Sequence, residues 1–287
     1  MRYAKVSILI IFVFKDIKEI LKKRYFLHLA YNGYKFHGWQ TQLKVKSVQE
    51  VIEKQLSKVL KTETKCHGCG RTDAQVHASQ YFLHFVTEQT IDFDLIFRLN
   101  KTLPDAIAVY DLIPFEIRVN AQRDAIKRTY DYFIHGDKNP YLSEFSSLQE
   151  LQNLDLELMG ETVSFLQTVK DFRSLCISVE QYKTTICEIF DLSFYINPKN
   201  NRLRISITAN RFLRKMIRII VASIMEVGNG KISLENFIND VMNGERPSIT
   251  KPAHPQGLFL TKVSYPYLNI APKFNPILDN EEWSLLV

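Results

Sequence analysis

Hydrophobic side chains alternate with other side chains along several short segments, at the period of two that is typical of a β-strand. The first segment is Arg24–Tyr31, in which every second residue is a tyrosine or a leucine. Near the middle of the chain, Tyr130 and Tyr132 share one face of another such segment. The pattern predicts strands over residues 24–31, 79–86, 107–113, 129–135, 190–196, 203–209 and 257–265.

Helical periodicity separates these strands, with hydrophobic residues three and four positions apart. Ser47 and Glu50 have the spacing of a capping box, which predicts that a helix begins there. Gly228 is a candidate C-cap for a long helix. Besides the helix after Ser47, helices are predicted over residues 94–101, 148–158 and 212–227, and after Ser233. Antiparallel-looking strands mixed with one or two helices in each half predict the α+β class.

A turn-rich cluster, Gly136–Pro140, lies at the midpoint and is the best candidate for a linker. We therefore predict an N-terminal catalytic half over residues 24–136 and a C-terminal half over residues 137–287. Residues 1–23 form an N-terminal extension of unknown role. Its apolar run, Val6–Phe14, is too short to span a bilayer, and no cleavage site of small residues follows. An extra packed element, a poorly cleaved signal and residues upstream of the true start all stay open.

Composition sets wide limits on function. The 287 residues are 46% hydrophobic and 24% charged, which is ordinary for a globular protein. The net charge of +6 permits an RNA partner without requiring one. Four cysteines in a chain of this length do not make a disulfide framework, which fits a reducing, cytoplasmic location.

A polar, glycine-rich loop precedes the strand predicted at residues 79–86. Within Gly70–Ala74 it places the carboxylate of Asp73 two residues after the guanidinium of Arg71. Loops on rigid sheets commonly display reactive side chains. The ordinary alternative is an aspartate that caps a turn beside a surface arginine.

The wider sequence around Asp73 favours the reactive interpretation. Gly70–Ala74, followed by Val76-His77-Ala78, closely resembles the signature loop of the TruA family of tRNA pseudouridine synthases. Further segments are similar to blocks of that family and occur in the family's order over residues 24–267. They are Tyr31–Gln40, Leu99–Pro104, Arg128–Tyr132, Asn210–Arg218 and Gly257–Leu260.

The resemblance implies both a fold and an activity. The fold is the pseudouridine synthase fold: a central antiparallel sheet from two ferredoxin-like halves, flanked by helices, with an active-site cleft between them. The activity is the isomerisation of uridine to pseudouridine in the anticodon stem-loop of tRNA, at positions 38–40. The family acts as a homodimer, and no cofactor, metal or membrane is implied.

This chemistry needs few protein groups. An N-glycosidic bond breaks, the base turns and a carbon–carbon bond replaces it, with no redox change. One carboxylate, acting as nucleophile or proton acceptor on a flipped-out nucleotide, meets the requirement, and Asp73 fits it.

The resemblance also implies roles for other residues. Arg71 would help to keep the target nucleotide flipped, and Tyr130 would stack on its base. Arg218 would pair with Asp73, and Leu258 would wall the base pocket. Without the resemblance, Arg71 is an ordinary surface residue and Tyr130 an ordinary core residue.

Four cations follow helical spacing near the start of the helix predicted at 212–227. They are Arg211, Arg214, Lys215 and Arg218. No acidic residue is interleaved, so their mutual repulsion favours a polyanion, such as an RNA backbone, or a buried acid nearby. A solvated helix face is the alternative.

Cys66 and Cys69 have the spacing of half a zinc site. The other cysteines, Cys176 and Cys187, lie too far apart to form a second half. We therefore predict no metal and interpret Cys66 and Cys69 as two semi-buried thiols at a strand end.

Two positions depart from the family pattern: Gln75, where the family usually has glycine, and Leu175. They leave open a divergent paralogue that modifies another RNA. A non-catalytic RNA-binding protein on the same fold is a further alternative, but intact Asp73, Tyr130 and Arg218 argue against it. The sequence does not identify the target nucleotide, and it gives the oligomeric state only by resemblance.

Overall fold

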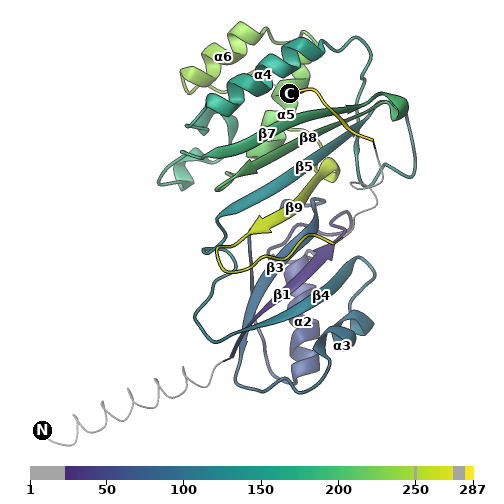
Figure 1. Cartoon of the computed structure of the whole chain (residues 1–287), viewed down its shortest axis with the longest axis vertical. Coiled ribbons are helices and arrows are strands. Elements are labelled where there is room, and N and C mark those ends of the chain that lie inside the picture. The colour runs from purple at the N-terminus through teal and green to yellow at the C-terminus, as the bar shows by residue number, and fades with distance from the viewer. Residues whose placement is uncertain (1–22, 249–250, 274–281) are drawn as a thin grey trace, which may run out of the picture.

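The computed structural model describes residues 23–248, 251–273 and 282–287 (Figure 1). The expected extension at residues 1–23 therefore lies, except for Lys23, outside the described residues. The strands are β1 (Lys23–Tyr31), β2 (Cys66–Gly68), β3 (His77–Thr87), β4 (Ile107–Phe115), β5 (Lys127–His135), β6 (Ser147–Leu148), β7 (Ile189–Asn197), β8 (Arg202–Ala209), β9 (Leu258–Ser264) and β10 (Ser284–Leu285). The α-helices are α2 (Val48–Leu60), α3 (Leu95–Thr102), α4 (Leu156–Thr168), α5 (Met216–Gly228) and α6 (Leu234–Met242).

All ten strands belong to one sheet with the order β10-β7-β8-β5-β9-β3-β1-β4, in which β2 pairs with β3 and β6 with β5. The first half runs β1-α2-β2-β3-α3-β4 and has the spatial order β4-β1-β3-β2. The second half runs from β5 to β9 and has the order β9-β5-β8-β7. Both orders are those of a βαββαβ ferredoxin-like unit. The predicted α+β fold with a central sheet from two ferredoxin-like halves is confirmed.

The two halves meet where β3 lies beside β9. Their parallel register pairs His77 with Phe259 and Ala78 with Leu260. Figure 1 shows α2 and α5 behind the sheet in this view, so helices of both halves cover the same face.

The strand β5 belongs to the second half by its hydrogen bonds. It pairs with β8 from Arg128 to His135 and with β9 on its other side. A boundary at residue 136, as predicted, would separate β5 from both partners. The turn-rich cluster Gly136–Pro140 instead leads from β5 toward β6, because turn residues mark loops within a domain as well as linkers between domains. We propose a boundary between Phe115 and Lys127.

The helix α2 begins where the sequence predicts. The backbone N–H of Glu50 donates to the side-chain oxygen of Ser47 over 3.2 Å, which satisfies one of the free N–H groups of the first turn. The apolar stripe of the helix is buried in the core. It consists of Val48, Ile52, Leu56 and Leu60.

Two predicted helices begin later than expected. The helix predicted at residues 148–158 is α4, which begins at Leu156 after its cap Asp155, and Leu148 belongs to β6 instead. The helix predicted to begin at residue 212 is α5, which begins at Met216 because Lys215 adopts a left-handed conformation with φ of 59°. The later start leaves Arg214 and Lys215 before the first turn, where the helix dipole disfavours cations, whereas Arg218 lies within that turn.

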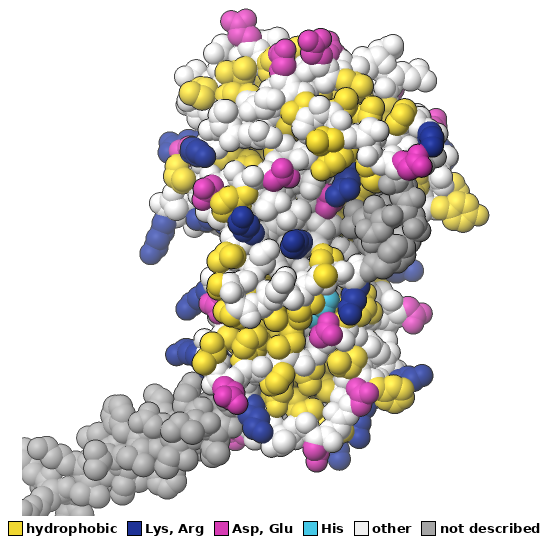
Figure 2. Space-filling model, in the orientation of Figure 1, with side chains coloured by type: hydrophobic (Ala, Val, Ile, Leu, Met, Phe, Trp, Pro, Cys, Tyr) yellow, Lys and Arg dark blue, Asp and Glu magenta, His cyan; other side chains and the backbone are white. Residues whose placement is uncertain are grey.

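The face of the sheet opposite α2 and α5 is covered differently. Figure 2 shows hydrophobic side chains gathered on this face over the N-terminal half. After β9 the chain turns across it, and Tyr265 packs its ring 5.4 Å from Phe26 and 5.5 Å from Phe82. Two of the residues predicted for the site, Tyr130 and Leu258, lie on the other, helix-bearing face, because Tyr132, two residues after Tyr130 and opposite Leu258, lines a pocket together with residues of α5.

Candidate active site

Asp73 lies on the loop between β2 and β3, beside an arginine from the other half of the chain. Its Oδ2 atom is 3.2 Å from Nη1 of Arg218, which projects from the first turns of α5. The side chain of Asp73 is 35% exposed and that of Arg218 is 13% exposed. The carboxylate therefore has a fixed counter-ion and a free side that a ligand can reach.

The Asp73 loop is held from both sides by the strand β1 and the segment that follows it. The hydroxyls of Tyr31 and Thr72 share a hydrogen bond of 2.8 Å, and the backbone N–H of Trp39 donates to the carbonyl of Thr72 over 3.2 Å. Gly38 has a φ of +83°, and a Cβ there would lie 2.4 Å from the carbonyl oxygen of Thr72. Glycine at position 38 is therefore required for the close approach of the two segments.

Gln75, the departure from the family pattern, takes up the left-handed conformation with a φ of 66°. Its backbone N–H donates to the carbonyl of Phe36 over 3.1 Å. A non-glycine residue in this region carries a strain of roughly 1 kcal/mol. The loop thus keeps a backbone geometry that glycine favours, although the side chain differs.

Arg218 is restrained by backbone groups as well as by Asp73. Its Nε donates to the carbonyl of Ala253 over 2.6 Å, and the N–H of Ala253 donates back to the carbonyl of Arg218 over 2.9 Å. This exchange fixes the guanidinium plane, so that one Nη atom faces Asp73. The contribution of Ala253 comes from its backbone, so no sequence signal at that position pointed to it.

Tyr130 and Leu258 lie on the helix-bearing face of the sheet. Tyr130 is 7% exposed, and its ring meets that of Phe212 edge to face, with centroids 5.1 Å apart. Burial raises the pKa of the Tyr130 hydroxyl, and the negative charge of Asp73 adds to the effect. Leu258 is buried opposite Tyr132 in the β5–β9 register, which places it on the face of Tyr130. Phe212 was not predicted as a site residue, because a single phenylalanine near a predicted helix start is typical of a hydrophobic core position.

The predicted basic stripe on a helix is wrong in its geometry. Of its four cations, Arg218 lies in α5, and the others lie in the non-helical segment that leads into it. Arg211 stacks over the ring of Tyr182 at 5.9 Å, and the backbone N–H of Arg214 donates to the hydroxyl of Tyr182 over 2.8 Å. Arg214 is exposed, as is Arg71 in the Asp73 loop.

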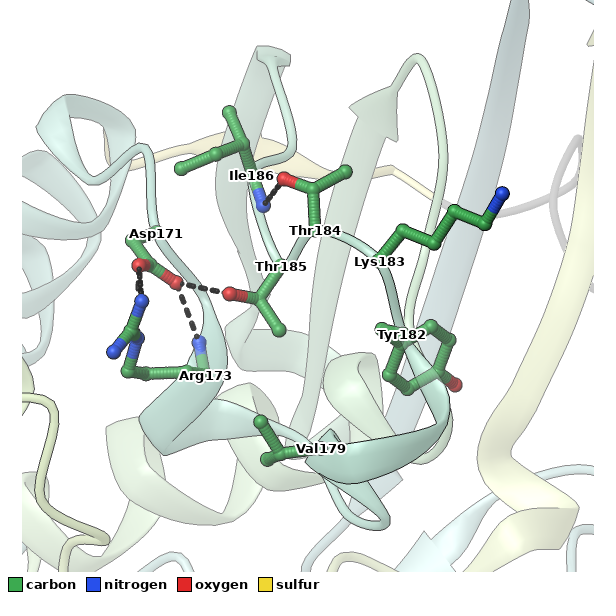
Figure 3. A pocket seen from close by; sticks show the side chains of 8 residues that line it. All are labelled: Asp171, Arg173, Val179, Tyr182, Lys183, Thr184, Thr185 and Ile186. Carbon is green, nitrogen blue, oxygen red and sulfur yellow. Dashed lines mark hydrogen bonds and ion pairs between the residues drawn. The ribbon is translucent and has the colours of Figure 1, made fainter.

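Tyr182 also walls a pocket of about 280 Å³ (Figure 3). Figure 3 shows Asp171 and Arg173 on one side of this pocket, and Tyr182 and Lys183 on the other. Burial acts to raise the pKa of Asp171, but hydrogen bonds from Thr185 and Arg173 outweigh it and lower that pKa. The carboxylate of Asp171 is therefore occupied within the protein.

A second pocket, of about 150 Å³, lies between Tyr132 and the middle of α5, and Ala253 is in its wall. Asp73 lines neither of these two pockets. It lies instead on the partly exposed surface where the halves meet. The predicted cleft between the halves stays a prediction.

Cys66 and Cys69 are fully buried, more deeply than expected. Burial raises the pKa of Cys69 to about 11 and that of Cys66 further, so both remain thiols at neutral pH. In the described part of the chain, no three His, Cys, Asp or Glu side chains are grouped so as to hold a metal ion. None of the described helices is long and apolar enough to cross a membrane.

Comparison with known proteins identifies the class. A family model described as tRNA pseudouridine synthase matches residues 169–266. A protein of Porphyromonas gingivalis named tRNA pseudouridine synthase A is 35% identical over 246 residues, which is 85% of this chain and 97% of that protein. Proteins of the same name from Parabacteroides distasonis and Azobacteroides pseudotrichonymphae are 36% and 37% identical; each alignment covers 85% of this chain, with 96% and 97% of the respective relative.

The fold and these relatives define an RNA-modifying isomerase. The chain belongs to the tRNA pseudouridine synthase family. The predicted family and enzyme class are thereby confirmed.

Proposed function

We propose that this chain converts uridine to pseudouridine in the anticodon stem-loop of tRNA, at positions 38–40, with Asp73 as the catalytic residue. The observation that carries the proposal is the pair formed by Asp73 and Arg218. A partly exposed carboxylate from one half is held 3.2 Å from a guanidinium of the other half, in a chain that belongs to the tRNA pseudouridine synthase family.

The reaction balances without any added group. The bond between N1 of the base and C1′ of the ribose breaks, and a bond between C5 and C1′ forms after the base turns. The hydrogen on C5 leaves as a proton, and N1 gains one, so nothing is oxidised or reduced. Asp73 acts on the detached or detaching base as nucleophile or proton acceptor.

Arg218 keeps Asp73 in place during this sequence. Its guanidinium is fixed by Ala253, so the attraction between the opposite charges orients the carboxylate at close range. Tyr130, whose ring packs nearly perpendicular to that of Phe212, supplies a flat neutral surface on which the flipped base stacks. Such stacking contributes about 1–3 kcal/mol per base. Leu258 provides an apolar wall on the same face.

Cations on the same two segments as this pair bind the RNA backbone in our proposal. Arg71 precedes Asp73 by two residues and is exposed. Arg211, Arg214 and Lys215 directly precede the helix that carries Arg218. Their arrangement in a loop, instead of along a helix, lets them approach phosphates from several directions. The proposal includes a homodimer, by family resemblance, and a cytoplasmic location, which the four free cysteines fit.

Two alternative functions are compatible with the same fold. A paralogue for another RNA was suggested by Gln75, but the loop keeps the left-handed geometry at that position. A non-catalytic RNA-binding protein would not need the carboxylate and guanidinium in contact, and the contact is present.

Mapping of pseudouridine tests the proposal. The full chain is incubated with unmodified tRNA transcripts that carry uridine at position 38, 39 or 40, and the product is mapped at nucleotide resolution. We expect pseudouridine at these positions. Product elsewhere only would favour another target, and tight binding with no product in any RNA would favour the non-catalytic alternative.

A further inference from the structure

The distance between Asp73 and Arg218 depends on how the two halves are held together. The two residues are 145 positions apart in the sequence and lie on different halves. At the joint, the β3–β9 register consists of two residue pairs, His77 with Phe259 and Ala78 with Leu260. A short joint of this kind leaves the alignment of the two side chains to additional contacts.

Arg128, at the start of β5, makes such contacts. Its Nε and Nη2 atoms donate to the carbonyl of Cys69 over 3.1 and 2.7 Å. Its Nη1 atom donates to the carbonyl of Asn210 over 3.2 Å. Further bonds reach the carbonyl of Ala125 over 3.5 Å and that of Gln122 over 2.8 Å. One guanidinium thus ties together backbone segments from both halves.

These bonds leave Arg128 no donor for RNA. A guanidinium has five N–H groups and no acceptor. The five hydrogen bonds of Arg128 use one from Nε, two from Nη1 and two from Nη2. In contrast to the exposed Arg71 and Arg214, its role is therefore internal.

The two main carbonyls lie on the segments that carry the catalytic pair. Cys69 is four residues before Asp73, and its own N–H is anchored to the carbonyl of Phe82 on β3 over 2.8 Å. Asn210 follows β8 and begins the segment that leads to Arg218. Its side chain accepts from the N–H of Glu188 over 3.0 Å. Both carbonyls are thus fixed relative to the sheet.

Arg128 also shares its face of β5 with the stacking residue. Side chains two apart on a strand point to the same face, so Arg128 and Tyr130 lie on the side that bears the site. Arg128 pairs with Ala209 of β8 and Val263 of β9, which fixes its backbone on both sides. Arg128 therefore projects from the same strand as Tyr130, and the backbone of that strand is held by its two neighbours.

We propose that Arg128 is a positioning residue for the reaction: by binding the carbonyls of Cys69 and Asn210 it sets the alignment of Asp73, Arg218 and Tyr130. This inference rests on the proposed function of Asp73. The planar fork of arginine is needed because a lysine ammonium is a single point charge that cannot reach both carbonyls in fixed directions.

The first test replaces the planar guanidinium of Arg128 by a side chain that still has an N–H donor. Arg128→Lys and Arg128→Gln are compared with the unaltered chain in single-turnover reactions at saturating tRNA. We expect the rate to fall about tenfold to a hundredfold, because small misplacements of reacting groups have effects of that size. The dissociation constant for tRNA should change by less than about threefold, or roughly 0.7 kcal/mol. A normal rate in either folded variant would overturn the proposal.

A matched control separates positioning from stability. Arg204 is also a partly buried arginine, with Nε 2.7 Å from Oδ1 of the buried Asp131. It pairs with Phe133 of β5, so its side chain lies on the face of the sheet opposite Tyr130. Arg204→Lys should lower the urea midpoint and leave the single-turnover rate unchanged below that midpoint. An equal loss of rate in Arg204→Lys and Arg128→Lys would assign both to general stability.

Coupling to Arg218 gives a second readout. If Arg128 acts through the Asp73–Arg218 pair, Arg128→Lys should reduce the rate by less than about twofold in an Arg218→Ala background, because residues of one network are not additive. Rate losses that multiply would overturn the proposal. Failure of the proposed function itself looks different: the unaltered chain would then form no pseudouridine.

Discussion

The side chain of Arg218 is restrained from two directions at the candidate site. Its guanidinium is 13% exposed and is held between the carboxylate of Asp73 and the carbonyl of Ala253. Arg214, four residues earlier, is exposed and precedes the helix. Two arginines of the same sequence block therefore have different environments, and we expect different consequences when each is removed.

Replacement of Arg218 should affect rate more than affinity. Arg218→Ala leaves Asp73 without its counter-ion, and we expect turnover to fall roughly a hundredfold, as when a fixed electrostatic partner is removed from an active site. Arg218→Lys should recover part of the loss, because an ammonium does not reproduce the planar fork. Single-turnover rates and tRNA dissociation constants measure both effects.

Arg214→Ala is the comparison for this prediction. It should weaken tRNA binding, with a smaller salt dependence, while the rate at saturating tRNA is retained. An Arg218→Ala variant with a normal rate and only weaker binding would place Arg218 on the RNA backbone instead of beside a reacting carboxylate at Asp73.

At the scale of elements, β3 carries two buried histidines that must stay neutral. The Nδ1 atom of His77 accepts from the backbone N–H of Gly33 over 3.1 Å, and that of His84 accepts from the N–H of Ala121 over 3.1 Å. A protonated imidazole cannot accept these bonds. Burial lowers the pKa of His77 and of His84 to about 4 in each case.

The pH dependence of stability follows from these shifts. Each folded pKa lies below the unfolded value of about 6.5, so the stabilising contribution is fully present above pH 6.5 and is lost as the pH falls toward 4. We expect a loss of roughly 1–2 kcal/mol per histidine in the free energy of unfolding at pH 5. Urea unfolding at several pH values measures it.

Asparagine variants isolate the contribution of β3. The side-chain oxygen of asparagine can accept the same backbone N–H but does not titrate in this range. His77→Asn and His84→Asn should each make the free energy of unfolding less dependent on pH between 6.5 and 4.5. A pH dependence equal to that of the unaltered chain in both variants would contradict the assignment.

The elements themselves were predictable to the extent that local pattern determines them. Alternation located the strands, and Ser47 located the start of α2. The helix at residues 148–158 was misplaced because Leu148 pairs with His135 of β5, a contact that no local period encodes. The start of α5 was misplaced because Lys215 takes a left-handed conformation that lysine rarely adopts.

At the scale of the whole molecule, the site lies at the joint of two similar halves, and this limits what residue patterns alone can predict. Asp73 and Arg218 lie 145 positions apart. Their contact was therefore predicted from family resemblance and not from the periodicity of hydrophobic residues. Resemblance also supplied Tyr130 and Leu258. It did not supply the membership of β5 in the second half or the positioning role of Arg128, because both depend on hydrogen bonds between segments that are distant in the sequence.

The most direct test of the account is the rate of pseudouridine formation by Asp73→Asn. Asparagine keeps the shape of the side chain and lacks its charge, so we expect at least about a thousandfold loss of turnover. Folding and tRNA affinity should be nearly unchanged. Asp111→Asn is the matched control: Asp111 is 37% exposed, pairs with His28 over 2.7 Å and lies on β4, so its replacement should leave turnover intact. Near-normal turnover by a folded Asp73→Asn variant would contradict the account.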